Sequence, residues 1–457
     1  MTAAEAFDCV VVGSGPGGYV AAIRAAQLGM RTAVVERAGV GGRCLHWACI
    51  PAKTVLRSAD VVSEIQEAGT FGIQVGPPHV DFSVVAKRRQ EVVRTLSSGV
   101  GGLLKKNQIE VVTAEATLTA DRAVRAGNRL LAAPAVVLAT GSVRTSVPGV
   151  ALGGRVVGTE EAWSFEALPR SLVVVGAGAS GTEIASAYAR LGSDVRLVEY
   201  ADRVLPTEDA DVSAVVRRGL QDQGVTVHTS TLVAGVDPAG AGVACTLGED
   251  RVEAEWLVVA AGRRADVAAL GLDAAGVALD GTGRIAVDGH LRTSADGVYA
   301  IGDLVAGPAL AHKASDEGII AVETAAGNTV PGIDHAVIPR ATFCTPNVGS
   351  VGITEAAARD AQFDVTVGKV PYRAVGAGTV YGDRSGLVKI VGDRRYGTVL
   401  GAHIVGPRAT ELVQEIVDVM VGEVGYPELA RTVHGHPTLS EAILEAARAA
   451  DGWLVHG

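Results

Sequence analysis

The hydrophobic residues of this chain gather in short runs that end at a glycine or an acidic residue. The first run, Phe7–Gly13, has the composition of a buried parallel strand. A helical pattern follows over Gly18–Leu28, and a second buried run, Arg31–Glu36, comes after it. Strand, helix and strand in this order predict one βαβ unit at the start of the chain.

The same order of elements returns in the middle of the chain. Buried runs at Ser171–Gly178 and Asp194–Tyr200 flank a helical stretch at Thr182–Leu191. The repetition indicates a duplicated unit and not the period of a solenoid. Further buried runs complete the two units: Ala135–Gly141, Trp256–Gly262 and Gly297–Asp303.

From about His335 the pattern changes. Alternating polar and β-branched residues with Pro and Gly turns predict an antiparallel sheet, with helices at Ala409–Val421 and Ser440–Ala450. The expected fold class is therefore α/β, with two Rossmann-like dinucleotide-binding domains followed by a C-terminal α+β domain. The expected boundaries divide the chain into residues 1–144, 145–270, 271–335 and 336–457.

A glycine-rich turn joins the first strand to its helix and has the spacing of a dinucleotide fingerprint. Gly13, Gly15 and Gly18 fit G-x-G-x-x-G, and Gly17 lies within it. Such glycines let the backbone approach a pyrophosphate at a helix N-terminus, where free N–H groups favour anions. Glu36 ends the next strand, where a carboxylate can hold ribose hydroxyls.

The second unit carries the same fingerprint in Gly176, Gly178 and Gly181, and Glu199 ends its next strand. A carboxylate there accepts hydrogen bonds from a free ribose 2′-hydroxyl and repels a 2′-phosphate, so NAD is expected in preference to NADP. Two fingerprints predict two dinucleotides, and we expect one to be a flavin and the other a nicotinamide.

The composition argues against several other classes of protein. The formal net charge is -10 without a run of Lys or Arg, so neither nucleic acid nor an anionic membrane is an expected partner. No apolar run approaches the roughly 20 residues of a membrane span, and no secretory signal is expected. Five cysteines in 457 residues favour a reducing, cytoplasmic compartment.

Two of these cysteines, Cys44 and Cys49, lie close together in the segment GGRCLHWACIPAK. On a regular helix their side chains would diverge by roughly 140°, so they need a distorted backbone to meet. Gly41 and Gly42 supply that freedom, and Pro51 suits the first turn of a helix that begins just after Cys49. The N-terminus of such a helix would lower the pKa of the Cys49 thiol. A zinc site and a structural disulfide are the alternatives. Because no further ligands have zinc spacing, a redox-active pair is favoured and no metal is expected.

A second group of reactive side chains lies near the C-terminus, in VHGHPTLSE. Thr438 and Glu441 fit the S/T-x-x-E capping box of a helix. A histidine held by a glutamate is also the arrangement of a general acid–base. Taken by themselves, His434 and His436 are more simply interpreted as histidines of a surface loop.

These motifs resemble those of the pyridine nucleotide-disulfide oxidoreductases, and most of all those of the dihydrolipoamide dehydrogenases among them. The resemblance runs the length of the chain through both fingerprints, GG-x-C-x4-C-x-P-x-K, ATG at 139–141, AGR at 261–263, YAIGD at 299–303, LAHKA at 310–314 and HPTLSE at 436–441. It implies a glutathione reductase-like fold. Residues 1–144 and 271–335 would bind FAD, residues 145–270 NAD, and residues 336–457 would form a dimer interface.

The resemblance also implies roles for single residues. Cys49 would be the charge-transfer thiol beside the flavin, and Cys44 the interchange thiol. His436, oriented by Glu441, would be the acid–base and would reach the cysteines of the other subunit. Lys53 would pair with Glu183 near the flavin. Expected contacts are, for FAD, Gly13, Gly15, Gly17, Gly18, Glu36, Lys53, Gly141, Asp303 and Ala311; for NAD, Gly176, Gly178, Gly181, Glu199 and Gly262; and, for the cofactors generally, Arg37, Gly42, Thr140, Gly302, His312 and Arg263.

The implied reaction is FAD-dependent oxidation of dihydrolipoamide to lipoamide with reduction of NAD⁺, in a homodimer whose active site is shared between subunits. The substrate would be lipoamide or a lipoyl domain, within a 2-oxoacid dehydrogenase or glycine-cleavage complex. Alternatives are another NAD(P)H-dependent disulfide reductase and an NADH:quinone reductase (a diaphorase) with incidental thiols. Arg43, His46 and Trp47 depart from the residues common in the redox segment, and they bear on the substrate rather than on the fold.

Overall fold

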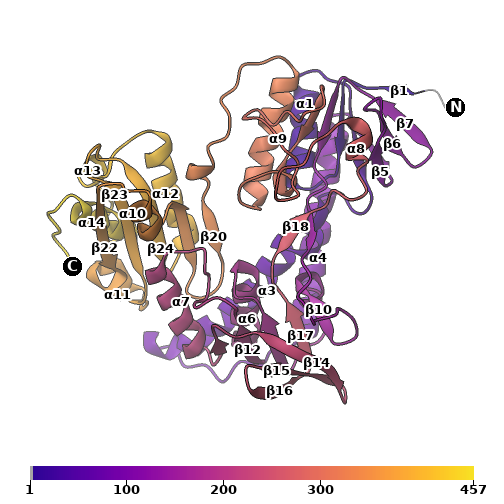
Figure 1. The fold of residues 1–457 in the computed structure, drawn as a ribbon. Helices are drawn as coiled ribbons and strands as arrows, with labels where there is room; N and C mark the ends of the chain where they lie inside the picture. Colours follow the sequence, from indigo (N-terminus) through magenta and orange to yellow (C-terminus); the bar gives the residue numbers. More distant parts are fainter. Residues whose placement is uncertain (1–3) are drawn as a thin grey trace. The chain divides into compact units, whose positions relative to one another are not determined.

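The computed structural model describes residues 4–457, in which the chain divides into two compact units (Figure 1). Each unit combines three separate stretches of the chain. The first unit contains the stretches up to residue 54, 87–145 and 262–335, and the second contains 55–86, 146–261 and 336–457.

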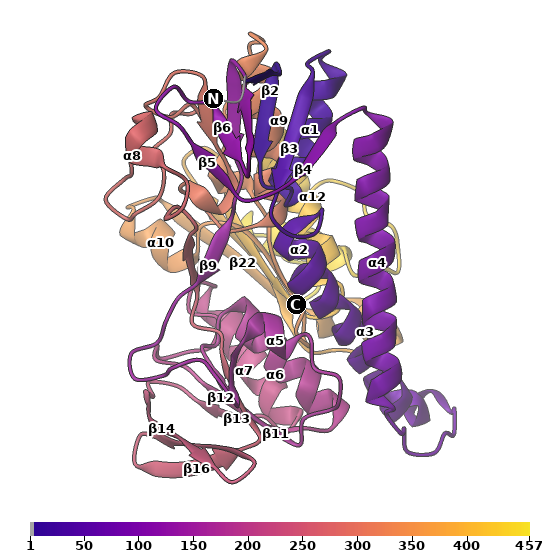
Figure 2. The same ribbon diagram turned by 90° about the vertical axis from the view of Figure 1, so that its right-hand side faces the viewer.

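The first unit is built on a parallel sheet in the order β19–β8–β2–β3–β4. Val10 and Val12 of β2 pack into a core shared with the small sheet β1–β7–β6–β5, whereas Cys9 and Val11 pack into a second core with α1 and α9. Helices α1 and α9 lie side by side in both views (Figures 1 and 2). The strands and helices named so far are β1 (Glu5–Ala6), β2 (Cys9–Val12), α1 (Pro16–Gln27), β3 (Thr32–Glu36), β4 (Glu110–Thr113), β5 (Ala116–Leu118), β6 (Val124–Ala126), β7 (Arg129–Ala132), β8 (Ala135–Leu138), β19 (Val298–Ala300) and α9 (Ala311–Ala325).

Further elements lie between these strands and helices in the sequence. Strands β9 and β18 pair antiparallel, and a short 3-10 helix, η2, follows β19. Two helices, α2 and α3, follow β3 in the sequence, and a long helix, α4, precedes β4. The bounds are α2 (Gly42–Trp47), α3 (Cys49–Glu67), α4 (Phe82–Lys106), β9 (Ser142–Arg144), β18 (Arg263–Ala265), α8 (Leu272–Ala275) and η2 (Gly302–Leu304).

The second unit contains a second parallel sheet, in the order β10–β17–β11–β12–β13. Val173 and Val175 of β11 pack with residues of the antiparallel sheet β14–β15–β16, so this small sheet covers one face, as its counterpart does in the first unit. The bounds are β10 (Val156–Gly158), α5 (Thr159–Ala162), β11 (Ser171–Val175), α6 (Ala179–Leu191), β12 (Asp194–Val198), α7 (Ala210–Asp222), β13 (Thr226–His228), β14 (Val233–Ala239), β15 (Gly242–Leu247), β16 (Asp250–Ala254) and β17 (Trp256–Val259).

The C-terminal part of the second unit is an antiparallel sheet in the order β20–β21–β24–β23–β22. Val388 and Ile390 of β23 share a core with Ile416 of α12 and Ile443 of α14. The bounds are β20 (Arg340–Thr342), β21 (Val348–Gly352), α10 (Glu355–Asp360), β22 (Val365–Pro371), α11 (Gly376–Val380), β23 (Leu387–Asp393), β24 (Val399–Val405), α12 (Ala409–Val421), α13 (Tyr426–Leu429) and α14 (Glu441–Ala450).

This architecture confirms the expected fold class, with two parallel sheets and a C-terminal antiparallel sheet. The helix predicted at Gly18–Leu28 begins earlier, at Pro16, because proline is well placed in the first turn of a helix. The predicted domain boundaries stay predictions. Within residues 4–457, each helix is either too short or too polar to cross a bilayer.

A buried lysine on β23 pairs with carboxylates at the start of α7 and of α10 in the second unit. Lys389 Nζ of β23 lies 2.9 Å from Asp209 Oδ1, 2.8 Å from Asp211 Oδ2 and 2.8 Å from Glu355 Oε2. Asp209 also caps α7, because its carboxylate accepts a hydrogen bond from the Asp211 N–H. Burial is the largest single influence on both aspartates and opposes their ionisation, but the hydrogen bond from Lys389 together with the other nearby positive charges and hydrogen bonds lowers their pKa values.

Replacing Lys389 with methionine is expected to destabilise the protein by about 3–5 kcal/mol, because buried carboxylates lose their cation. Lys369→Met is the matched control. Lys369 also pairs with Asp211, at 3.1 Å, but it is half exposed, so its loss should cost less than about 1 kcal/mol. Because the carboxyl pKa values are lowered in the folded protein, the difference in unfolding free energy between the wild type and Lys389→Met should be largest above roughly pH 4. It should decline as the pH falls further. Urea unfolding midpoints test this, and equal shifts for the two variants would contradict it.

Candidate active site

The first fingerprint forms a turn that is tight at its ends and open at its middle. Gly13 has φ +99°, and a Cβ added to it would lie 2.5 Å from the Ala139 carbonyl oxygen. A Cβ on Gly18 would lie 1.9 Å from the Gly13 carbonyl oxygen. By contrast, no atom lies within 4 Å of a Cβ placed on Gly15. The turn therefore leaves a cradle that a side chain at Gly15 would fill, at the N-terminus of α1, where a pyrophosphate fits.

Glu36 is held in place beside this cradle. Its Oε2 accepts hydrogen bonds from the Ser14 N–H at 2.8 Å and the Ser14 hydroxyl at 2.7 Å, and its Oε1 accepts one from the Ala38 N–H at 2.9 Å. The carboxylate is thus fixed at the end of β3, where it fits the hydroxyls of a ribose.

The second fingerprint repeats this geometry. A Cβ on Gly176 would lie 2.7 Å from the Ala260 carbonyl oxygen, whereas one on Gly178 would have no atom within 4 Å. Glu199 accepts hydrogen bonds from the Ala177 N–H at 2.6 Å and the Ala201 N–H at 2.9 Å, as Glu36 does from the corresponding positions. The duplication predicted from sequence therefore extends to single hydrogen bonds, and both sites fit a dinucleotide.

Four other expected cofactor residues of the first unit are held through two intermediaries, Asp266 and Ser142. Arg37 pairs with Asp266 at 3.1 Å, and the Thr140 hydroxyl donates to the Asp266 carbonyl oxygen. The Ser142 hydroxyl donates to the Asp303 carboxylate, and Arg263 donates in turn to Ser142. Ala311 and His312 occupy the first positions of α9, Gly302 and Asp303 lie in η2, and an added Cβ on Gly141 would meet no atom within 4 Å.

The segment that carries the thiols is anchored to the first cradle. The Gly41 N–H donates to the Ser14 carbonyl oxygen at 3.0 Å, and both Gly41 and Gly42 have positive φ angles. A Cβ on Gly42 would lie 2.8 Å from the Gly15 Cα, so the two loops are in close contact. The glycines place α2 against the nucleotide cradle, whereas the distortion that they were predicted to supply between the two cysteines lies at Ala48.

The backbone break that the two thiols require occurs at Ala48. Helix α2 ends there, with Ala48 at φ -132° and ψ -95°, and α3 begins at Cys49. Cys44 and Cys49 are free thiols in this structure, and their side chains are hydrogen-bonded to each other. The predicted meeting of the two cysteines is therefore confirmed.

The two thiols differ strongly in acidity. The hydrogen bond from Cys44 lowers the pKa of Cys49 to about 7; burial opposes this, and the positive charges of Lys53 and Arg43 support it. The same hydrogen bond, with burial, raises the pKa of Cys44. Cys49 is therefore the thiol of the pair that ionises first, and Cys44 keeps its proton. The sequence predicted the direction for Cys49, but a helix N-terminus is not its main cause.

The three unusual residues of the redox segment have different surroundings. His46 is half-buried, with Nε2 3.0 Å from the Val40 carbonyl oxygen. Trp47 is 40% exposed, and it lies one helical turn after Cys44 on α2. Arg43 contributes charge to the thiol pair, as described above. Of the three, Trp47 is the most exposed residue.

His436 and Glu441 form the expected dyad. His436 Nδ1 lies 2.9 Å from Glu441 Oε1, and the His436 side chain is 75% exposed. Glu441 Oε2 accepts a hydrogen bond from the Thr438 N–H at 2.8 Å. The capping box is thus only half formed, because the Thr438 hydroxyl donates to the Gly435 carbonyl oxygen and α14 begins at Glu441. Burial opposes ionisation of Glu441, but the hydrogen bonds from Thr438 and His436 outweigh it and lower its pKa.

The interpretation of His434 as a surface histidine is wrong. Its side chain is only 6% exposed and contacts Glu415 of α12. Glu183, in α6, is also buried, and its Oε1 accepts a hydrogen bond from the Phe343 N–H at 2.9 Å. The pairing of Lys53 with Glu183, and the approach of His436 to the cysteines, stay predictions.

Sequence reasoning missed the two serines that organise the site. Ser14 joins Glu36 and Gly41, and Ser142 joins Asp303 and Arg263. Each follows a motif glycine directly, at the x position of G-S-G and after ATG. A small hydroxyl residue at such a position is the signal that could have identified them.

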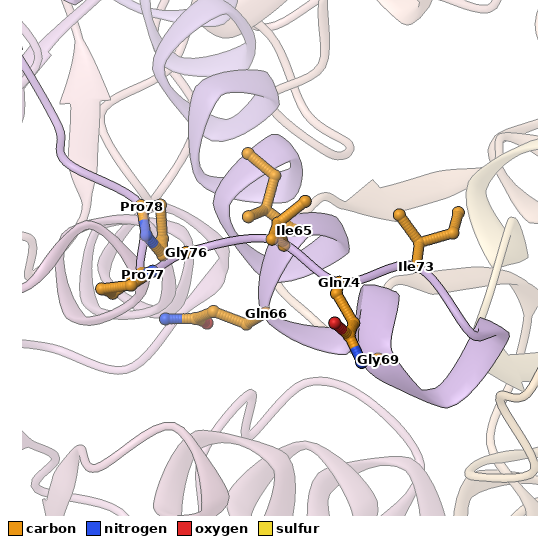
Figure 3. Close-up of a pocket in the computed structure, with 9 residues that line it drawn as sticks. Ile65, Gln66, Gly69, Ile73, Gln74, Gly76, Pro77 and Pro78 are labelled. Atoms are coloured by element: carbon orange, nitrogen blue, oxygen red, sulfur yellow. The ribbon is translucent and has the colours of Figure 1, made fainter.

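A cavity of about 620 Å³ lies elsewhere, at the connection between α3 and α4 (Figure 3). Its lining contains no titratable or nucleophilic side chain, so it does not offer the chemistry of the thiol pair. The lining residues are Ile65, Gln66, Gly69, Ile73, Gln74, Val75, Gly76, Pro77 and Pro78.

Comparison with known proteins agrees with this geometry. Residues 7–318 match the pyridine nucleotide-disulphide oxidoreductase family, and residues 338–447 match its dimerisation domain. The chain is 42% identical to the dihydrolipoyl dehydrogenase of Chlorobaculum tepidum, over 98% of this chain and 97% of the relative. It is 40% identical to that of Mycobacterium tuberculosis, over 98% and 99% of the two chains.

Solved structures show the same fold. LpdA from Mycobacterium tuberculosis superposes with a TM-score of 0.88 at 29% identity, covering 96% of this chain and 99% of that chain. The Cu(II) complex of RclA, a HOCl-induced flavoprotein disulfide reductase from Escherichia coli, superposes with a TM-score of 0.87 at 27% identity, covering 97% and 99%. The family depends on FAD and a pyridine nucleotide, and its dimerisation domain indicates a homodimer. The chain therefore belongs to the pyridine nucleotide-disulphide oxidoreductases and is a flavoprotein disulfide oxidoreductase.

Proposed function

We propose that this enzyme oxidises dihydrolipoamide to lipoamide and reduces NAD⁺. The observation that carries the proposal is the Cys44–Cys49 pair. Cys49 has the lowered pKa, and Cys44 holds the proton. The full-length similarity to several dihydrolipoyl dehydrogenases supports a dithiol substrate of this class.

The residues of the chain suit each step of the exchange. His436 accepts a proton from the dithiol, and the resulting thiolate attacks Cys44 Sγ of the oxidised pair. Cys49 then leaves as a thiolate, which its low pKa favours. The second substrate thiol closes the substrate disulfide and releases Cys44, which regains its proton. When bound, FAD would take the two electrons and pass them to NAD⁺ as hydride.

We also propose that the active site is shared between the subunits of the homodimer. His436 is 75% exposed, and Val433, three residues before it, is 95% exposed. An apolar side chain this exposed beside a reactive histidine suits a surface that a second subunit covers. The dimerisation-domain match includes both residues, which supports this arrangement.

NAD is the proposed coenzyme because Glu199 is fixed as a carboxylate acceptor at the end of β12. A 2′-phosphate beside it would meet a like charge, so we expect kcat/KM for NADH to exceed that for NADPH by at least about 100-fold. Steady-state kinetics with NADH and NADPH in parallel, against lipoamide, glutathione disulfide and mycothiol disulfide, measure coenzyme and substrate together. Turnover of a glutathione-type disulfide with NADPH, but not of lipoamide with NADH, would overturn the proposed function.

A further inference from the structure

A histidine whose side chain is largely shielded from solvent lies two residues before His436. The His434 side chain is 6% exposed, whereas that of His436 is 75% exposed. The backbone between them is a short loop after α13, and it reaches α14 at Glu441. His434 is therefore placed to fix the loop from inside the protein while His436 faces outward.

Both ring nitrogens of His434 face acceptors. Nδ1 lies 3.0 Å from the Thr432 carbonyl oxygen, and Nε2 lies 2.7 Å from Glu415 Oε1. A carbonyl oxygen and an ionised carboxylate only accept hydrogen bonds, and a neutral imidazole has only one N–H to donate. Both contacts are satisfied together when the ring is an imidazolium and Glu415 is a carboxylate.

The charges around His434 favour that protonation state. The hydrogen bond to Glu415 raises the pKa of His434; burial opposes this, and the hydrogen bond to Thr432 adds to it. Glu415 faces the ring from α12, and Glu441 and Arg448 act on it from α14, with Arg448 as the opposing cation. The nearby carboxylates therefore outweigh the nearby guanidinium.

The loop that carries His436 is consequently tied at both ends. On one side, His434 joins it to α12 through Glu415. On the other side, the Thr438 N–H is bound by Glu441, the same carboxylate that accepts from His436. Loss of the first tie would let the His436 ring move relative to Glu441 and the reacting thiols.

We propose that His434 is a positioning residue whose imidazolium, paired with Glu415, fixes the loop that presents His436 for proton transfer. The inference rests on the proposed role of His436 in thiol–disulfide exchange. It adds a second histidine–glutamate pair to the site, one that acts through the first and does not touch substrate.

The test uses the holoenzyme dimer with three variants and a matched control. His434→Gln and Glu415→Gln are each expected to lower kcat for lipoamide about 10- to 100-fold with little change in KM, because His436 is misplaced. NADH-dependent quinone reduction should stay unchanged. His434→Arg, which keeps a cation with several donors, should recover part of the loss. Glu411→Gln, an exposed carboxylate one turn earlier on α12, should leave both activities unchanged.

The protonation state gives a readout that does not depend on any substrate. Histidine-selective ¹⁵N NMR should show the His434 ring protonated at pH 7.5 in the wild type. In Glu415→Gln it should lose its proton near the ordinary histidine value of roughly 6.5. Because a raised pKa keeps the charged form at higher pH, lipoamide turnover in Glu415→Gln should decline at a lower pH than in the wild type.

Three results would overturn the inference. The first is a neutral His434 ring in the wild type at pH 7.5. The second is a lipoamide activity in His434→Gln and Glu415→Gln equal to that of Glu411→Gln. The third is an equal fall in lipoamide and quinone activities in these two variants, which would indicate general loss of structure. If the wild type reduces quinones but not lipoamide, the proposed function fails instead, and the NMR measurement still decides the state of His434.

Discussion

Cys44→Ser is expected to lower lipoamide turnover by at least about 1,000-fold, because it removes the sulfur that forms the bond to the substrate. Quinone reduction by NADH should stay within about two-fold of the wild type, since it does not use the thiol pair. Steady-state assays of both activities on the same preparation measure the effect. Cys344→Ser is the control, because Cys344 is buried and its thiol is directed at the Pro346 carbonyl oxygen.

Cys49→Ser should abolish lipoamide turnover equally but should differ from Cys44→Ser in its spectrum. In Cys44→Ser, the serine hydroxyl can still donate to Cys49, and Lys53 and Arg43 remain, so Cys49 stays a thiolate above a pH of about 7. A thiolate-to-flavin charge-transfer band should therefore persist in Cys44→Ser, fade as the pH falls through about 7, and be missing in Cys49→Ser. A band in Cys49→Ser alone would reverse the roles of the two cysteines. A wild type without lipoamide activity, unaffected by either change, would make the thiols incidental.

His436→Gln should lower lipoamide turnover by roughly 100- to 10,000-fold, the usual contribution of a general acid–base, and should leave quinone reduction intact. The matched control is His456→Gln. His456 also directs Nδ1 at a glutamate, Glu445, at 3.1 Å, but it lies beyond α14 and should not affect turnover. Comparable losses in the two variants would show that the effect of His436 is not specific.

Mixing inactive subunits then tests whether the active site is shared. In a heterodimer of Cys44→Ser and His436→Gln subunits, one shared site would combine an intact cysteine pair with an intact histidine. Such a heterodimer should recover about half of the wild-type activity, since one of its two sites is complete. If each subunit instead supplied its own histidine, both sites would be defective and mixing would recover nothing.

The sequence predicted those parts of the fold that depend on local pattern. Buried runs such as Phe7–Gly13 became parallel strands because both of their faces pack against apolar layers. The motif glycines were predictable because only glycine fits where a Cβ would meet a carbonyl oxygen, as at Gly13 and Gly18.

Interactions between distant segments were less predictable. The sequence attributed the low pKa of Cys49 to the start of a helix, whereas the hydrogen bond from Cys44 is its main cause. His434 was interpreted as a surface residue because its partner, Glu415, lies 19 residues away in the sequence, on α12. Similarly, Lys389 gives no sign in its own segment that three carboxylates from α7 and α10 will surround it.

The order of the strands along the chain has a consequence for synthesis on the ribosome. The first parallel sheet pairs β8 with β19, whose residues 298–300 are made long after those of β8. The second parallel sheet draws all its strands from residues 156–259. Because domains fold as units as they emerge, the second nucleotide fold can be complete while the first still lacks an edge strand. The nucleotide-binding fold nearest the N-terminus is therefore completed after the second one. We expect a nascent chain to retain flavin only after α9 has emerged from the ribosome.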